Sequence, residues 1–257
     1  MGVDKVRAKK HLGQHFLKDK RIAAAIVDSL GADGCDTVME VGPGMGVLTE
    51  YLVARQFPSF KVVEIDMESV DYLRKNISGI DEIITGDFLE IDLRPMGESI
   101  AVIGNFPYNI SSQIFFRVLE NRDRVKEVVC MVQKEVAERI CSAPGSRVYG
   151  ILSVLLRAWY DIEYLFTVNE AVFSPPPKVK SAVIRLQRNK RSRLGCDEEL
   201  FISVVKRCFN QRRKMLRNPL KMMVKPDAGE MAYLQMRAEQ LSVEKFEELT
   251  CWVAANR

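Results

Sequence analysis

The residues Asn105-Phe106-Pro107-Tyr108 place an amide, a proline and an aromatic ring directly after an apolar run. The oxygen of Asn105 and the backbone carbonyl that precedes Pro107 can each accept a hydrogen from an exocyclic amine. Tyr108 can stack on the planar ring that carries this amine. Accepting the hydrogens moves electron density from the ring back to the nitrogen and directs it at an electrophilic methyl group. The pattern favours such a transfer over its alternative, a strand end with a proline turn.

Three glycines, Gly42, Gly44 and Gly46, stand between an apolar run and a helical pattern. Glycine permits a tight turn and a close approach of the backbone to a ligand. The spacing G-x-G-x-G differs from the G-x-G-x-x-G of dinucleotide binders, whose helix N-terminus is aimed at a pyrophosphate. A ligand without phosphate needs only the close approach, and S-adenosylmethionine is such a ligand. The alternative is a turn that serves packing alone.

Acidic residues end the next two predicted strands. Glu64 follows the glycines by about 20 residues, where an acidic residue typically binds the ribose hydroxyls of an adenosine cofactor. Asp66 lies on the same face of the strand by alternation, so a helix-capping role must be distinguished from ribose binding. Asp87 could accept a hydrogen bond from the exocyclic amine of the cofactor's adenine, or could only cap a helix or form a turn.

These residues need a scaffold, and the pattern of residues 37–133 supplies one. We expect strands at residues 37–42, 60–66, 82–87, 99–105 and 127–133. We expect helices between them at residues 47–56, 67–77 and 111–121. The alternation predicts an α/β fold, a Rossmann-like parallel sheet with helices on both faces. Asn105 then ends a strand in the region where such sheets bind ligands.

The rest of the chain predicts further strands and a second domain. We expect helices at residues 134–141 and 147–160 and strands at residues 159–168 and 179–188. Three consecutive prolines at residues 175–177 predict that residues 171–180 form a stiff extended loop. Residues 188–195 read as a linker, and residues 201–216 predict one amphipathic helix with Lys206, Arg213 and Arg217 on its polar face. We therefore predict a first domain at residues 1–189 and a small all-helical domain at residues 190–257.

Basic residues gather in two segments of a chain whose net charge is +4. Residues 175–225 contain fifteen Lys and Arg against three acidic residues. The first 21 residues add seven Lys and Arg against two Asp, including Lys5 and Asp4. Such asymmetry favours a polyanionic partner over a merely solvated surface. Arg212, Arg213, Lys214 and Arg217 are the residues that we expect to contact phosphate.

Other features narrow the class of protein. None of the six cysteines forms a C-x-x-C pair, and there are only two histidines, so we expect free thiols and no metal site. No run approaches the roughly 18 apolar residues of a membrane span. The basic N-terminus is not followed by the apolar region of a secretory signal. We expect a cytoplasmic protein without a membrane partner, and predict a monomer.

Successive blocks of the chain resemble the ribosomal RNA adenine dimethyltransferases, most closely the bacterial small-subunit enzymes, nearly from end to end. The blocks are HLGQHFL, EVGPGMGVLTE, VVEID, TGDFL, IGNFPYNISS, VFSPPPKVKSAVI and FNQRRKMLRN. The resemblance implies transfer of methyl groups from S-adenosylmethionine to two adjacent adenosines near the 3′ end of small-subunit rRNA, each methylated twice, in the maturing small ribosomal subunit.

The resemblance also implies roles for individual residues. Cofactor contacts are implied at His15, Leu17, Gly42, Gly44, Glu64, Asp87 and Asn105. Tyr108 and Phe173 would hold the target base from its two sides, with Asn105 as the catalytic amide. The helical C-terminal domain and the basic surfaces would contact rRNA, and Lys178 and Lys180 are further candidates for RNA binding.

Three positions depart from the usual family pattern. His15 replaces an asparagine, so a backbone or ring-nitrogen contact could survive there but an amide contact could not. Phe106 replaces a more common leucine and should be tolerated as apolar. Lys180 replaces a more usual acidic residue, which disfavours a salt bridge from this position and favours a phosphate contact.

Three other functions compete with this interpretation. A large-subunit rRNA adenine methyltransferase would share the cofactor residues, but VFSPPPKVKS and FNQRRKMLRN favour the small-subunit enzyme. A non-catalytic RNA-binding assembly factor is disfavoured by the intact Asn105 and Tyr108. An NAD-dependent oxidoreductase is disfavoured by the glycine spacing.

Overall fold

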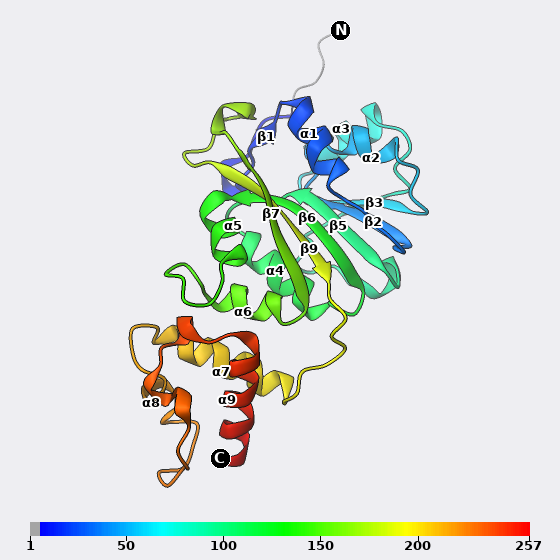
Figure 1. The fold of residues 1–257 in the computed structure, drawn as a ribbon. Helices are drawn as coiled ribbons and strands as arrows, with labels where there is room; N and C mark the ends of the chain where they lie inside the picture. Colours follow the sequence, from blue (N-terminus) through cyan, green and yellow to red (C-terminus); the bar gives the residue numbers. More distant parts are fainter. Residues whose placement is uncertain (1–5) are drawn as a thin grey trace. The chain divides into compact units, whose positions relative to one another are not determined.

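The computed structural model describes residues 6–257 (Figure 1). Asp4 and Lys5 of the basic N-terminal segment lie outside the described residues. The chain divides into two compact units. The first comprises the chain up to Ala137 together with Ile162–Arg188, and the second comprises Glu138–Asp161 and Asn189–Arg257. The predicted domain boundary between residues 189 and 190 lies next to the division between Arg188 and Asn189. Residues 138–161, however, group with the C-terminal helices, and their position in the sequence does not indicate this.

A seven-stranded sheet organises the first unit, in the order β4-β3-β2-β5-β6-β9-β7. Its strands are β2 (Thr37–Val41), β3 (Phe60–Glu64), β4 (Glu82–Thr85), β5 (Ile100–Asn105), β6 (Val125–Gln133), β7 (Tyr160–Val168) and β9 (Ser181–Arg188). Strands β2 to β6 pair in parallel, and β9 runs antiparallel to β6. The predicted α/β fold with its mainly parallel sheet is confirmed.

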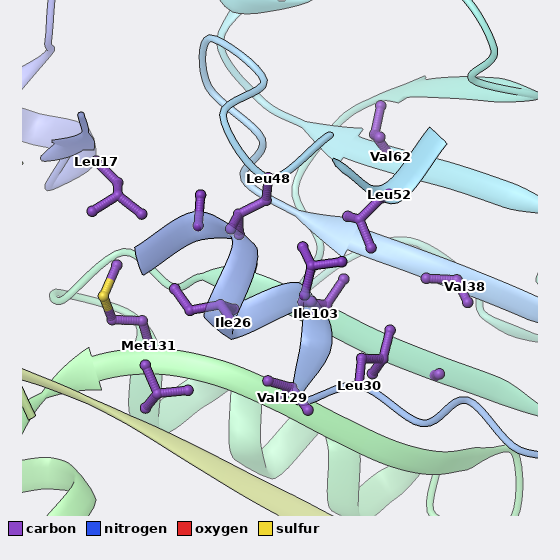
Figure 2. Packing of buried hydrophobic residues seen from close by; sticks show 14 of the residues in the cluster. Leu17, Ile26, Leu30, Val38, Leu48, Leu52, Val62, Ile103, Val129 and Met131 are labelled. Atoms are coloured by element: carbon purple, nitrogen blue, oxygen red, sulfur yellow. The ribbon is translucent and has the colours of Figure 1, made fainter. Parts of the chain in front are cut away.

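Helices cover both faces of this sheet. They are α1 (Lys20–Asp28), α2 (Thr49–Val53), α3 (Met67–Asn76) and α4 (Ser111–Glu120), followed by α5 (Lys134–Cys141), which continues into the second unit. Ile26 of α1 and Leu52 of α2 share one core cluster with Val62 and Ile103 of the sheet (Figure 2). Leu73 of α3 belongs to the same cluster. Helix α4 lies on the opposite face (Figure 1). Burial of both faces explains why the central strands are nearly continuous apolar runs.

The proline-rich segment departs from the predicted loop at its start. A 3₁₀ turn at Glu170–Val172 leads into β8 (Phe173–Ser174), which pairs antiparallel with β1 (Phe16–Leu17). A short 3₁₀ turn at Lys10–Leu12 precedes β1. The two-stranded pairing thus joins the N-terminal segment to the residues just before the prolines, although about 160 positions separate them in the sequence.

The second unit is helical, as predicted. It contains α6 (Ile151–Arg157), α7 (Glu198–Asn210), α8 (Arg217–Leu220) and α9 (Val243–Ala255), with 3₁₀ turns at Ala232–Gln235 and Ala238–Gln240. The predicted single helix at residues 201–216 was wrong beyond Asn210. The backbone N–H of Leu216 donates to the carbonyl of Met236 at 2.9 Å instead of continuing a helical ladder. Arg213 therefore lies in a turn, not on a helix face.

The glycine of the Asn105 strand should be irreplaceable on steric grounds. A Cβ atom at Gly104 would lie 2.4 Å from the backbone oxygen of Val41 and 3.2 Å from the Phe106 ring. Because β2 and β5 are adjacent inner strands of the sheet, neither strand can move away to make room for the added atom. We expect Gly104→Ala to lower the free energy of unfolding by about 2 kcal/mol or more in urea denaturation. Gly229→Ala, where nothing lies within 4 Å of the added atom, should change it by less than about 0.5 kcal/mol. Equal stability of the two variants would contradict the steric argument.

Candidate active site

A cleft opens where β2, β3, β4 and β5 end. Its volume is about 800 Å³, including the part open to solvent, which is the size of a small-molecule site. Six predicted residues line it: His15, Gly42, Gly44, Glu64, Asp87 and Asn105. A second cleft of about 860 Å³ shares Phe16, Gly42 and Asn105 with the first and is lined by Leu17. The structure therefore brings all seven predicted cofactor residues to two adjoining clefts.

Strand alternation explains how three polar side chains reach the same face. Each of β2, β3 and β5 contributes to the core cluster beneath the first three helices, among others through Val38, Val62 and Ile103. Because side chains two positions apart share a face, the residues at the ends of these strands point the same way. These residues are Glu40, Glu64 and Asn105.

The glycine turn has the backbone that its sequence requires. Gly42, Gly44 and Gly46 have φ angles of 68°, 57° and 78°, in the left-handed region that other residues rarely adopt. A Cβ atom on Gly44 would also lie 2.8 Å from the ring of Phe16. The glycines thus allow the chain to reverse direction in this turn, and they allow the segment that carries Phe16 to approach closely.

Glu64 is held by two backbone donors. One carboxylate oxygen accepts the N–H of Gly44 at 3.0 Å, and the other accepts the N–H of Asp66 at 2.9 Å. Only 4% of the residue is exposed, and this burial raises the pKa of Glu64 against the opposing effect of the two hydrogen bonds. Each oxygen keeps a further lone pair, so the group can still accept hydroxyl hydrogens from a ligand.

The two other acids near the cleft, Asp66 and Asp87, make different contacts. Asp66 caps α3 by accepting the N–H of Glu68 at 3.1 Å, and it binds Lys9 and Gln14. The hydrogen bonds from these partners hold the pKa of Asp66 below its usual value although burial opposes them. Asp87 lines the first cleft and also accepts the N–H of Leu89 at 2.9 Å with one oxygen. Asp66 thus caps α3, Glu64 lines the cleft without capping a helix, and Asp87 combines a turn with a place in the cleft.

Asn105 has an amide whose orientation is fixed. Its Nδ2 donates to the backbone oxygen of His15 at 2.9 Å. Because a carbonyl oxygen can only accept, the NH₂ group faces His15, and the amide oxygen is left for the cleft that Asn105 borders. This contact uses the main chain at position 15, so it does not depend on the replacement of asparagine by histidine there.

Tyr108 lies beside the cleft, under the ring of His15. The two rings stack with centroids 5.3 Å apart at an angle of 28°, and Nδ1 of His15 donates to the carbonyl of Pro175 at 2.8 Å. The hydroxyl of Tyr108 shares a hydrogen bond with Ser181 at 2.5 Å. Burial raises the pKa of Tyr108, so its ring is neutral at physiological pH.

Phe173, the second predicted stacking residue, lies elsewhere in this structure. It is 1% exposed, pairs with Leu17 across β1 and β8, and belongs to the core cluster. It lines neither of the two clefts. A role for Phe173 against a target base therefore stays a prediction, and it would need the ring to leave its present packing.

Residues 5–254 match the family described as ribosomal RNA adenine dimethylase. The chain belongs to this family. Among curated relatives, it is 56% identical to ribosomal RNA small subunit methyltransferase A of Parabacteroides distasonis over 249 residues, which are 95% of this chain and 93% of the relative. It is also 56% identical to the protein of the same name from Cytophaga hutchinsonii, over 96% and 98% of the two chains.

Solved structures agree with this membership. A dimethyladenosine transferase from Plasmodium falciparum superposes with a TM-score of 0.77 at 23% identity, over 91% of this chain and 96% of that chain, which shows the fold. The 23S rRNA methyltransferase ErmE has a TM-score of 0.67 at 26% identity, over 91% and 98%. Because the chain belongs to the rRNA adenine dimethylase family, it is an enzyme of rRNA methylation, and its family uses S-adenosylmethionine as the methyl donor.

The clefts of the dimethylase fit this cofactor. The glycine turn leaves space that a Cβ atom would take, Glu64 offers oxygens to ribose hydroxyls, and Asp87 keeps an oxygen for an adenine amine. Ile65, directly after Glu64, is 49% exposed and lines the same cleft, where an apolar side chain can contact a flat ring. The sequence analysis did not predict that Ile65 and Phe16 line the cleft. Ile65 could have been found as the apolar residue directly after the acid that ends β3. Phe16 could have been found from its position within HLGQHFL.

The N-terminal strap, defined here as residues 9–17, closes one side of these clefts. Asn105 donates to the strap at His15, and Asn109 donates to the carbonyl of His11 at 3.5 Å. Gln14 donates to Asp66 at 3.1 Å. The strap is therefore bound to side chains at or shortly after the ends of two strands, β3 and β5.

The predicted RNA-binding residues differ in their exposure and in their hydrogen bonds within the protein. Lys178 and Lys180, before β9, have exposed side chains, as do Arg213, Lys214 and Arg217 in the second unit. Arg212 is different, because its guanidinium donates to the carbonyls of Ser146 and Arg147 and lies 3.7 Å from a carboxylate oxygen of Glu239. Arg212 is thus engaged within its own unit, which a count of basic residues could not reveal.

Residues 6–257 contain neither a metal-binding cluster nor a membrane-spanning helix. No group of three or more His, Cys, Asp or Glu side chains in this range is placed to hold a metal ion. No helix in the same range is long and apolar enough to cross a membrane. The six cysteines are free thiols, as predicted.

Glu40 is a buried acid whose ionisation should make stability depend on pH. It is 1% exposed, Thr49 donates to it at 2.6 Å, and burial together with the nearby Glu64 raises its pKa from 4.5 to about 8. Between these two values the folded protein retains a proton that the unfolded chain has released. The free energy of unfolding should therefore fall as pH rises through this window.

Glu40→Gln should remove this loss of stability. The glutamine oxygen can still accept from Thr49, and no charge is buried at any pH. We expect the variant to unfold like the wild type near pH 4.5 and to be more stable at pH 8 by more than about 1.4 kcal/mol, the equivalent of one pKa unit. Chemical denaturation at several pH values measures this, with the exposed Glu50→Gln as a control. Parallel pH profiles for wild type and Glu40→Gln would contradict it.

Proposed function

We propose that this dimethylase methylates the exocyclic amines of two adjacent adenosines near the 3′ end of small-subunit rRNA, twice each, during ribosome biogenesis in the cytoplasm. The names of the relatives at 56% identity support the small subunit as its target. The fixed amide of Asn105 carries the chemical part of the proposal, because it offers an oxygen acceptor at the mouth of the cofactor cleft. We further propose that the protein acts as a monomer.

The chain's own residues then have separate tasks. S-adenosylmethionine, when bound, supplies a methyl group attached to a positively charged sulfur. The oxygen of Asn105 and the carbonyl before Pro107 accept hydrogens of the adenine amine, which raises its electron density. Tyr108 offers a ring on which an extruded base can stack, since a paired adenine hides its amine. Stacking there requires the ring of His15, which now covers Tyr108, to yield or to join the stack.

One experiment tests the proposed target and the transfer itself. The protein is incubated with labelled S-adenosylmethionine and either small or large ribosomal subunits that lack adenine methylation, and the modified nucleosides are identified by mass spectrometry. Dimethyladenosine in small-subunit rRNA near the 3′ end is the expected result. Transfer to the large subunit only would favour the large-subunit function, whereas binding without transfer would favour a non-catalytic assembly factor.

The exposed cations should contribute to RNA affinity through their charge. Replacing Arg213, Lys214 and Arg217 together by glutamine should weaken rRNA binding and make its dependence on salt shallower by about 2 in a log–log plot, because fewer counterions are released. Filter binding at several salt concentrations measures the slope. Arg212→Gln is the matched control, since its guanidinium bonds carbonyl groups and its loss should lower stability instead. An unchanged slope in the triple variant would assign the three cations to the solvated surface.

A further inference from the structure

A pocket in the helical second unit is separate from the cofactor clefts. It has a volume of about 670 Å³, including its open part, and it is bordered by α8, the loop after it and α9. Leu220, Val224, Leu234 and the indole of Trp252 supply apolar surface. Arg217, Lys221 and Lys225 supply positive charge, and the residues that line the pocket include no acid.

Hydrogen bonds hold the walls of this pocket in place. The indole Nε1 of Trp252 donates to the carbonyl of Gly229 at 3.1 Å, which fixes the orientation of the ring. Asn256 accepts the N–H of Gly229 at 3.1 Å and the N–H of Lys225 at 2.8 Å, and it donates to the carbonyl of Trp252 at 2.8 Å. Asn256 thus joins α9 to the loop, so the aromatic wall and a basic wall are positioned together.

The charges of the pocket point to an anionic ligand. The side chains of Arg217, Lys221 and Lys225 are exposed, and none of the three makes an ion pair within residues 6–257. Three cations beside an aromatic, apolar wall match a ligand that is flat and apolar at one end and anionic at the other. A nucleotide has this form, because every base has a face that can stack on an aromatic ring and is attached to phosphate.

We infer that this pocket binds one unpaired nucleotide of RNA, with its base against Trp252 and its phosphates against Arg217, Lys221 and Lys225. The inference rests on the proposed function, in which the protein binds rRNA, and adds a second place where a base is held outside a helix. This base would not be a methylation target, because no predicted cofactor residue lines the pocket. Its role would be to fix the register of the RNA.

Trp252 offers a direct test, since the chain has only two tryptophans. In a Trp159→Phe background the fluorescence of Trp252 reports on the pocket alone. We expect quenching by an eight-nucleotide single-stranded oligoadenylate, and little quenching by the same length of RNA duplex or by inorganic polyphosphate. No quenching by the single strand, or equal quenching by polyphosphate, would overturn the inference, because the pocket would then bind nothing or bind charge only.

Affinity measurements separate stacking from charge and from misfolding. Filter binding of the oligoadenylate to otherwise wild-type protein should weaken about tenfold with Trp252→Leu and with the double variant Lys221→Gln and Lys225→Gln. Trp252→Phe, which keeps a ring, should stay within about threefold of wild type. Lys190→Gln, at an exposed position outside this pocket, should stay within about twofold. Equal affinity of Trp252→Leu and wild type would overturn the inference.

Methyl transfer to small ribosomal subunits, measured with the same wild-type protein, separates the two proposals. Intact transfer without quenching would reject the nucleotide pocket and leave the proposed function standing. Quenching with single-stranded RNA but no transfer to either subunit would retain the pocket and reject the proposed function.

Discussion

Asn105→Ala should lower methyl transfer by at least about 100-fold, the usual effect of removing one oriented polar group at a reacting centre. The variant loses the oxygen that we expect to accept a hydrogen of the target amine. It also loses the bond from Nδ2 to the carbonyl of His15. Since one neutral hydrogen bond contributes about 1 kcal/mol, the affinity for S-adenosylmethionine should fall less than about tenfold.

Single-turnover transfer and equilibrium cofactor binding, measured side by side, distinguish these two effects. Asn76→Ala is a matched control, because its amide also donates to a backbone carbonyl, that of Tyr72 at 2.7 Å, but on the exposed side of α3. It should leave both quantities unchanged. If Asn105→Ala transferred methyl groups at the wild-type rate, the amide would have no chemical role and would serve only to hold the N-terminal strap.

Glu64→Gln should weaken cofactor binding by about 100-fold or more. A glutamine can place its single oxygen against the N–H of Gly44 or that of Asp66, but not against both. Its NH₂ group then faces one backbone donor, and a ribose hydroxyl loses a charged acceptor. Hydrogen bonds to charged groups contribute about 1.5–3 kcal/mol each, and two such losses are enough for this effect.

Isothermal titration with S-adenosylmethionine measures the change for Glu64→Gln, and thermal unfolding without cofactor reports whether the turn has been disturbed. Glu82→Gln provides the comparison, because Glu82 lies in β4, pairs with Lys61 at 2.9 Å and lines neither cleft. It should bind the cofactor like the wild type. Unchanged affinity in Glu64→Gln would mean that another acceptor takes the ribose.

Local sequence determined the elements that carry the site. The Val- and Ile-rich runs predicted β2 to β6 to within about two residues, since a strand buried on both faces must be apolar along its length. The three glycines have the positive φ angles that their turn demands. Strand alternation places Glu64 on the face of Val62 and Asn105 on the face of Ile103, and the structure puts Val62 and Ile103 in one core cluster.

Tertiary structure decided what depends on partners distant in the sequence. The side chain of Asp66 is occupied by Lys9 and Gln14, and the orientation of the Asn105 amide follows from a carbonyl 90 positions away. Phe173 is buried because β8 pairs with β1. Such contacts cannot be predicted from the residues next to each position in the sequence.

The same limit applies to the charged surface. Arg212 and Arg213 are equivalent in the sequence, yet only Arg212 is bound to the carbonyls of Ser146 and Arg147. The predicted helix at residues 201–216 ends at Asn210, where Gln211 leaves the helical conformation, and Leu216 bonds to Met236 from another part of the second unit. Sequence thus determined which residue types could do the chemistry, whereas long-range hydrogen bonds and packing determined which of them are free to do it.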